Sequence, residues 1–408
     1  LSHYQYTKLK ESKSMKVSQV ATLINSVTSE IIGDSAVINE DLSNVVDIGK
    51  AIFDNTSYDN FVRTLVDHIG RVIFVDRVYT GNTLAVKRES WEYGAALEKI
   101  TAGLPAATEN ETWELEDGTS YDPNVFTKPE VSVKFYDKRI TFEIPLSIAD
   151  KQVKSAFSSA TQLNAFVSML WGAVDKSMAV KLEGLASRLV NSMIATTVNA
   201  EFPSVADNNY SGMTGVKAIN LLYLYNTDYG LTGGSALTKD NCMLSDTFLK
   251  YAVLQIEKTL SRMNRLSTLF NIGGEPRFTP DDKKHVILLS DFKAASDVFL
   301  QSGVFHDQYT QLPLATEVPY WQGSGTGYGL SSVANVHVEI PSGASTKEIN
   351  VGYVLGCAFD EDAVMLACLD ERTTSNYNAK AEFTNYWRKV ECGLFQDTNE
   401  NFVVFYVA

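Results

Sequence analysis

Residues 161–198, TQLNAFVSMLWGAVDKSMAVKLEGLASRLVNSMIATTV, carry the strongest periodic signal in the chain. Apolar side chains recur there every three or four residues and no proline interrupts them, which predicts an amphipathic α-helix. Such a helix would extend about 50 Å, beyond the usual length in globular proteins. The stripe needs a partner surface over its whole length. Its members are Leu163, Phe166, Val167, Leu170, Val174, Met178, Leu182, Leu185, Leu189 and Met193.

The segment before this helix alternates apolar and polar residues with period two, which predicts β-strands. The apolar positions are Leu84, Val86, Val131, Val133, Phe135, Ile140, Phe142 and Ile144. Between them, residues 109–122 hold acidic residues and no Lys or Arg, whereas the returning arm carries Lys128, Lys134, Lys138 and Arg139. We expect a long hairpin-like excursion whose acidic middle is either a solvated loop or a tip that docks on a basic surface of a neighbouring subunit.

Shorter patterns flank these two segments. Residues 14–54 predict two short amphipathic helices and residues 58–69 a third, which ends at Gly70 before a β-branched run at 72–78. An α/β region follows the long helix. Helices are expected over residues 216–225, 247–264 and 292–300, and strands over 286–289, 334–340, 353–359, 363–369, 383–395 and 401–407. The fold class is therefore α+β.

Composition restricts the function. Of 408 residues, 45% are hydrophobic and 11% aromatic, enough for a sizeable core and for contacts with other copies. The net charge of −14 is opposite to the basic stripe of a DNA-reading protein. The four cysteines, Cys242, Cys357, Cys368 and Cys392, form no C-x-x-C pair and no disulfide framework, so synthesis in a reducing cytosol is expected. The sequence shows no long apolar run and a polar start, so we expect a soluble, non-secreted chain with no membrane partner.

Motifs that would carry catalysis are weak. The histidines His3, His68, His285, His306 and His337 are widely spaced, with no zinc or acid–base pattern among them. Residues 323–329, GSGTGYG, miss the spacing of a dinucleotide loop and lack the lysine of a P-loop. Asp360, Asp362 and Glu371 match only part of a calcium loop, so a hairpin turn is the preferred interpretation there. We expect no enzyme activity, no metal and no cofactor.

The order of elements is similar to that of tailed-bacteriophage major capsid proteins with the HK97-like fold. Three stretches resemble those of the small podophages with protein-primed genomes: FVRTLVDHIG (61–70), VILLSD (286–291) and NYW (385–387). The resemblance implies an N-terminal arm (1–56), a peripheral domain (57–83, 146–215 with its spine helix, and 381–408), an extended loop (84–145) and an axial domain (216–380). Because the sequence stops at Ala408, we expect it to lack the immunoglobulin-like C-terminal domain of some relatives.

The function implied by the resemblance is self-assembly into pentamers and hexamers that form an icosahedral or prolate head around double-stranded DNA. The chain would be assembled in the host cytoplasm and reside in the virion. Its partners would be further copies of itself, and possible further partners are scaffold, portal and head-decoration proteins. DNA would be contacted non-specifically, and an acidic wall would let packed DNA slide. Trp91, Tyr93 and Trp113 in the extended loop are candidate interface anchors, with local packing as the alternative.

Two other functions stay open at this point. A nanocompartment shell, similar to encapsulins, would share the fold and enclose enzyme cargo instead of a genome. An α/β enzyme with a site dispersed over residues 216–380 is the other, although the long helix and the acidic excursion do not favour it. Separately, residues 1–16 carry Lys8, Lys10, Lys13 and Lys16 against Glu11, so this segment is either an arm that touches scaffold, DNA or a neighbour, or a solvated terminus.

Overall fold

The computed structural model describes residues 25, 78–88, 97–107, 114–122, 124, 126–149, 160–205, 208–301, 315–322, 330–342 and 345–408. The chain divides into two compact units. The first comprises Leu1–Val78, Ser147–Ala173 and Asn376–Asn385, and the second comprises Tyr79–Leu146, Val174–Ser375 and Tyr386–Ala408. The helices predicted within residues 14–69 lie outside the described residues, apart from Asn25, which is helical.

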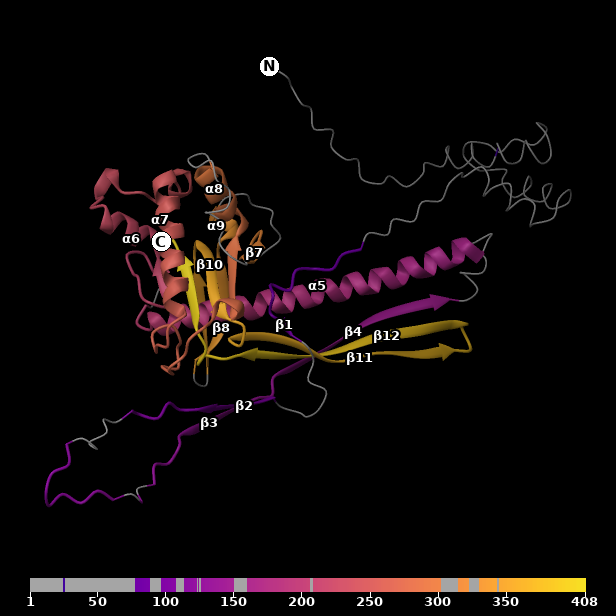
Figure 1. Ribbon diagram of the computed structural model, residues 1–408. Coiled ribbons are helices and arrows are strands. Elements are labelled where there is room, and N and C mark those ends of the chain that lie inside the picture. Colours follow the sequence, from indigo (N-terminus) through magenta and orange to yellow (C-terminus); the bar gives the residue numbers. More distant parts are fainter. Residues whose placement is uncertain are drawn as a thin grey trace. The chain divides into compact units, whose positions relative to one another are not determined.

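The long helix predicted from the apolar periodicity is confirmed as α5, Ala160–Glu201 (Figure 1). Within the second unit its apolar stripe is buried up to Leu185, and from Leu189 onward nearly every side chain around it is buried or half-buried. A helix that is covered on all sides belongs to the protein core, whereas a surface helix is covered on one face only. The helix ends at Glu201, two residues before Pro203, which cannot continue it.

A five-stranded sheet forms the centre of the second unit. Its order is β5 (Ala218–Asn220), β13 (Phe402–Tyr406), β10 (Val354–Asp360), β6 (Lys284–Leu289) and β7 (Ala315–Val318). The two outer pairs are parallel and the two inner pairs antiparallel. Every residue of β10 and β13 is buried, as expected for strands covered on both faces. Gly356 is needed in β10, because a Cβ there would lie 2.6 Å from the carbonyl oxygen of Ile287.

Helices pack beside this sheet: α6 (Leu221–Asp228) contacts β13, and α8 (Ser290–Gln301) contacts β6 and β7 (Figure 1). Between them lies α7 (Asp246–Met263), which contacts both helices and is capped by the Ser245 hydroxyl, an acceptor for the Phe248 amide. The predicted strand and helix over 286–300 are confirmed as β6 and α8. The helix predicted over 216–225 begins later, because residues 218–220 form β5 beside β13 and Asn220 then caps α6.

A second, four-stranded sheet has the order β1 (Lys87–Arg88), β11 (Val364–Asn378), β12 (Phe383–Gln396) and β4 (Arg139–Ala149). Ser147 of β4 donates a 2.5 Å hydrogen bond to the side chain of Asn385 in β12 within the first unit. The predicted turn at Glu361 and Asp362 exists, since the Ala363 amide donates to the Asp360 carbonyl over 2.9 Å. It is not a hairpin turn, because β10 and β11 belong to different sheets.

The remaining elements are short. Strands β8 (Val336–Ser342) and β9 (Ser345–Val351) pair as a hairpin, and β9 was not predicted because its STKEINV sequence has few apolar positions. Single helical turns occur at α9 (Leu330–Val333), η2 (Gly233–Ser235), η3 (Cys242–Leu244) and η4 (Asp281–Lys283). None of the helices in the described part of the chain is long and apolar enough to span a bilayer.

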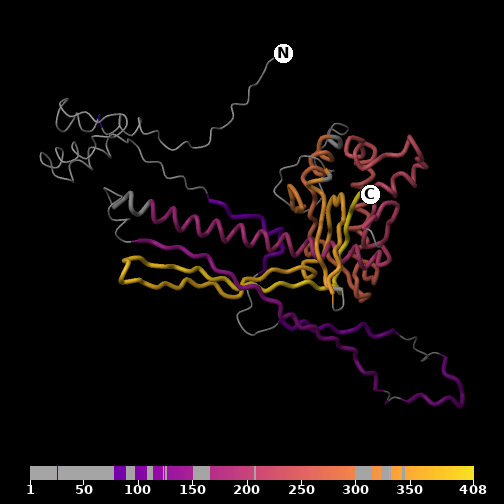
Figure 2. Tube along the Cα trace, turned by 180° about the vertical axis from the view of Figure 1, so that it is seen from behind, coloured from indigo at the N-terminus to yellow at the C-terminus, as the bar shows by residue number. Residues whose placement is uncertain are grey.

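The period-two region divides among three structures. Strands β2 (Leu97–Ala102) and β3 (Val131–Tyr136) pair with each other and with no further strand of the described residues, and Figure 2 shows them running side by side. Strand β4 pairs with β12 and not with β3. Leu84 and Val86 are buried in the core of the second unit. The continuous alternation therefore covers a core segment, a separate hairpin and a sheet strand, which periodicity alone does not distinguish.

Candidate assembly surface

The β2–β3 hairpin has two faces of opposite character. Directly opposed residues of an antiparallel pair point to the same side of the sheet. The register therefore shows which side chains share a face of the hairpin. One face, here called the outer face, carries the pairs Glu98–Phe135, Ile100–Val133 and Ala102–Val131. Its apolar members are strongly exposed, with 62% of Ile100 and 66% of Phe135 accessible. Apolar side chains in a row are thus left uncovered on this face.

The inner face carries the pairs Leu97–Tyr136, Lys99–Lys134 and Thr101–Ser132. The Thr101 and Ser132 hydroxyls lie 2.6 Å apart and hydrogen bond across the strands. The Tyr136 ring packs edge-on against Phe395 of β12, with 5.7 Å between the ring centroids. This face therefore contacts the rest of the second unit.

Two lysines opposite each other would repel, and two buried carboxylates compensate them. Lys99 Nζ lies 2.8 Å from Asp397 Oδ2 and 2.6 Å from Glu400 Oε1. Lys134 Nζ lies 3.0 Å from Asp397 Oδ1, and Arg277 Nε lies 3.3 Å from Glu400 Oε1. The carboxylates are 4% and 9% exposed, so water screens these pairs less than it would on an open surface. We call these five residues the anchor cluster.

The pKa values in the anchor cluster follow from burial and pairing. Burial alone raises the pKa of Asp397, but hydrogen bonds from Lys99, the Asn399 amide and Lys134 outweigh it and lower that pKa to about 2. For Lys99, burial lowers the pKa, and its bonds to Asp397 and Glu400 raise it overall. Burial raises the pKa of Glu400, and Lys99 and Arg277 offset only part of that rise. Asp397 and Lys99 are therefore both charged at neutral pH.

The anchor carboxylates come from the turn between β12 and β13. The Asp397 amide donates to the Ala363 carbonyl over 2.9 Å, and its Oδ1 accepts from the Asn399 amide over 3.0 Å. The turn is thus held to the core on one side and to the hairpin on the other. The charged inner face is fixed inward as a result, and the apolar outer face points away from the body that holds it.

The segment that connects β2 to β3 adds further exposed apolar side chains. Its described part has four large apolar side chains that are at least 44% exposed: Leu104, Leu115, Tyr121 and Phe126. They lie among Glu114, Glu116, Asp117 and Asp122, which belong to the acidic middle identified in the sequence. An exposed apolar surface with a charged border is typical of a protein–protein contact.

The residues singled out from the sequence are not those that define this surface. Trp91, Tyr93 and Trp113 lie outside the described residues, as do residues 1–16 and 323–329. The alternation at Val131, Val133 and Phe135 was recognised, but its outward orientation was not. The anchor cluster was missed because its bonded lysines and carboxylates lie 263 to 301 residues apart in sequence. A single lysine among the apolar residues of each strand is the one local signal that could have found it.

Other candidate sites have structural explanations. The Asp360 carboxylate accepts the Asp362 amide over 3.0 Å and so shapes the turn. Among the described residues no group of three or more His, Cys, Asp or Glu side chains is placed to hold a metal ion. The side chain of His285 packs against Arg88 and Phe359, and burial together with the Arg88 charge lowers its pKa. His337 lies 2.7 Å from Glu348 across the β8–β9 hairpin.

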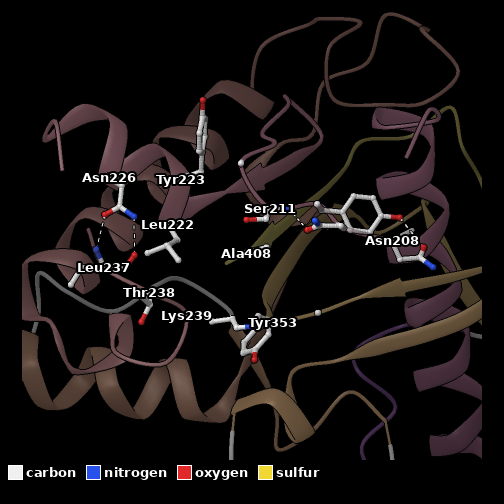
Figure 3. A pocket seen from close by; sticks show the side chains of 14 residues that line it. Asn208, Ser211, Leu222, Tyr223, Asn226, Leu237, Thr238, Lys239, Tyr353 and Ala408 are labelled. Atoms are coloured by element: carbon white, nitrogen blue, oxygen red, sulfur yellow. Dashed lines mark hydrogen bonds between the residues drawn. The ribbon is translucent and has the colours of Figure 1, made fainter. Parts of the chain in front are cut away.

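An open cavity of about 500 Å³ lies beside α6 (Figure 3). The side chain of Asn226 holds one wall through two hydrogen bonds with the Leu237 backbone, of 2.9 and 3.0 Å. Lys239 Nζ lies 4.8 Å above the ring of Tyr353. Among the residues that the structure describes, those that line the cavity include no Asp, Glu, His or Cys. Its walls offer amides, hydroxyls and one cation, whereas the hairpin offers a row of apolar side chains.

Comparison with known proteins identifies the family. The sequence model of the Phi29-like phage major capsid protein matches residues 21–406. The major capsid protein of Bacillus phage GA-1 is 26% identical over 160 residues, which are 36% of this chain. That match spans only 33% of the GA-1 protein.

Solved structures show the same fold. The chain resembles one from the capsid structure of Staphylococcus phage Andhra with a TM-score of 0.52 and 10% identity, over 83% of this chain and 87% of that one. It also resembles a chain from the structure of the head fiber and inner core protein gp22 of bacteriophage P68, with a TM-score of 0.50 and 8% identity, over 83% and 88%. The expected HK97-like fold is confirmed.

These matches also decide between the functions left open by the sequence. The family match indicates a phage major capsid protein, and these matches lend no support to a nanocompartment shell or an α/β enzyme. The chain belongs to the family of Phi29-like phage major capsid proteins.

Proposed function

We propose that this chain forms the shell of a phage head by assembling into pentamers and hexamers, and that the outer face of the β2–β3 hairpin joins one subunit to the next. The observation that carries the proposal is the orientation of the hairpin. Its charged face is bonded to its own subunit, and its apolar face is free for another copy. The second copy would supply the cover that the monomer lacks.

The energetics favour such a role. Burying a Val, Ile or Phe side chain contributes about 1.5–3 kcal/mol, before the costs of association are subtracted. The outer face offers Ile100, Val131, Val133 and Phe135. The binding free energy of each interface can then be modest, because a subunit that contacts several neighbours gains from effective concentration. Weak single contacts also let wrongly placed subunits dissociate.

In this proposal residues 84–145 act as the extended loop, residues 146–215 include the spine helix, and residues 216–380 form the axial domain around which capsomers close. Residues 1–56 serve as an arm, and residues 57–83 and 381–408 complete the peripheral domain. Trp91, Tyr93 and Trp113 add aromatic anchors to the loop, and its acidic middle docks on a basic surface of a neighbour.

The shell encloses double-stranded DNA without enzymatic action or a cofactor. The net charge of −14 supports non-specific contact, since an acidic wall does not hold phosphates tightly. Assembly takes place in the host cytoplasm, and scaffold, portal and head-decoration proteins are the further partners. The lysines in residues 1–16 would bind one of these proteins or the phosphates of DNA.

The test is a double substitution on the outer face, Val133→Asp with Phe135→Asp. The variant should stay soluble and folded but form no shells by negative-stain electron microscopy and sedimentation velocity. The control keeps the same positions apolar, Val133→Ile with Phe135→Leu, and should assemble. Normal shells from the aspartate variant would refute the role of the hairpin.

A further inference from the structure

Two of the four cysteines face each other across neighbouring strands. Cys368 lies in β11 and Cys392 in β12, and their Sγ atoms are 3.6 Å apart. The other two are isolated from this pair: Cys242 donates its thiol to the Lys239 carbonyl, and Cys357 is buried in β10. The chain thus contains one matched pair of thiols and two separate ones, which serve as internal controls.

The pair is differentiated in exposure and acidity. Cys368 is partly exposed, whereas Cys392 is buried. The hydrogen bond from Cys392 lowers the pKa of Cys368 to about 7 in spite of burial, and the charge of Lys87 acts in the same direction. The same bond, together with burial, raises the pKa of Cys392. The accessible sulfur is therefore the one that is readily present as the thiolate, the form that attacks a disulfide.

The geometry permits a bond between them. The two residues lie on neighbouring strands with their sulfurs in contact, and a disulfide requires Cβ atoms about 3.5–4.5 Å apart. The sulfurs would have to approach from 3.6 Å to about 2.05 Å, which side-chain rotation and a small closure of the strands supply. No distant segment has to move.

We propose that Cys368 and Cys392 form a redox-active pair that closes into a cross-strand disulfide when a small-molecule disulfide is the oxidant. The Cys368 thiolate attacks one sulfur of the oxidant, forms a mixed disulfide and releases one thiolate. Cys392 then loses its proton and attacks the Cys368 sulfur, which releases the second thiolate and forms the intramolecular bond. The two protein thiols are oxidised, and one disulfide molecule is reduced to two thiols.

The consequence is a covalent link at the centre of the four-stranded sheet. Strand β1 joins β11 next to this position, with Lys87 opposite Leu366 and Arg88 opposite Ala367. The bond would close residues 369–391 into a loop and so restrict the unfolded chain. In a reducing compartment the pair remains as thiols, and it closes once the protein meets an oxidising medium.

The test uses the full chain, reduced and then equilibrated with oxidised glutathione. Free thiols are alkylated under denaturing conditions, and peptides are identified by mass spectrometry. We expect one intramolecular link between Cys368 and Cys392, a mass loss of two hydrogen atoms, and full alkylation of Cys242 and Cys357. The oxidised protein should also melt several degrees above the reduced one.

Two variants separate the steps. Cys392→Ser removes the thiol that completes the disulfide, so it should trap glutathione on Cys368 as a stable mixed disulfide. Cys368→Ser should leave Cys392 unmodified. The proposal is overturned if the wild-type protein retains two alkylatable thiols at these positions, accumulates the glutathione adduct, or links two chains instead. Because the wild-type measurement needs no variant, misfolding of a variant does not affect it.

Discussion

Two regions of the molecule are rich in apolar residues but expose them differently to solvent: the core strands β10 and β13, and the hairpin β2–β3. In β10 and β13 every side chain is buried inside one subunit. In the hairpin most apolar side chains lie on the outer face, whereas the two lysines point inward to Asp397 and Glu400. The first arrangement stabilises a subunit by itself. The second leaves apolar area exposed until another molecule covers it, so the two regions should respond differently to substitution.

The largest effect on the subunit itself should come from the core. Phe359 is fully buried in β10 and stacks on Phe402 with 5.4 Å between the ring centroids. We expect Phe359→Ala to lower the free energy of unfolding by about 3–5 kcal/mol through lost burial and a cavity. Urea denaturation of unassembled subunits measures this change. A loss below about 1 kcal/mol would mean that the sheet is not the stabilising centre of the subunit.

The next effect should come from the anchor cluster. Asp397→Asn removes the charge that compensates both Lys99 and Lys134, and hydrogen bonds to charged groups contribute about 1.5–3 kcal/mol. Because the lysines are partly exposed, we expect the lower part of this range. Hydrogen exchange should speed up in β2 and β3 while β10 stays protected. The control is Asp370→Asn, whose 3.6 Å pair with Arg372 is exposed. Equal effects from both variants would refute the anchor.

Acid should release the hairpin before it affects the core. The pKa of about 2 for Asp397 lies below the ~3.9 of an unfolded aspartate, so its stabilisation is complete above about pH 4 and is lost as pH falls through about 2. Glu400 acts with the opposite sign, because its pKa is raised in the folded state. Limited proteolysis in residues 97–136 should therefore increase as the pH falls from about 4 to about 2. Asp397→Asn isolates the cause: the same acid response in that variant would contradict it.

The smallest effect on the subunit should come from the outer face. Phe135→Ala removes a side chain that is 66% exposed, so the free energy of unfolding should change by no more than about 0.5 kcal/mol. The yield of shells should nevertheless fall. Urea denaturation and sedimentation velocity of the same preparation measure both quantities. A large loss of subunit stability would show that Phe135 packs within its own chain.

Local sequence patterns predicted those elements whose partners need not be known. The 3.6-residue period identified α5, and the β-branched run followed by Ser290 and Asp291 identified β6 and α8. Strand β5 was missed because its three residues become a strand only beside β13, which lies almost 190 residues later. A period of two shows which residues share a face but not which face is covered.

The assembly surface was predictable only in part for the same reason. The alternation at Val131, Val133 and Phe135 is visible in the sequence, but its outward orientation depends on where Lys134 finds a partner. That partner, Asp397, lies in a turn 263 residues away, and no local pattern connects the two. Long-range ion pairs of this kind are set by the tertiary structure.

The central claim is that further copies of the chain cover the outer face of the hairpin in the assembled shell. Cryo-electron microscopy of assembled shells tests it most directly. The account predicts that Ile100, Val133 and Phe135 are buried against a neighbouring subunit while Lys99 and Lys134 stay bonded to Asp397 and Glu400 of their own chain. A map in which the outer face remains open to solvent on both sides of the shell would contradict it.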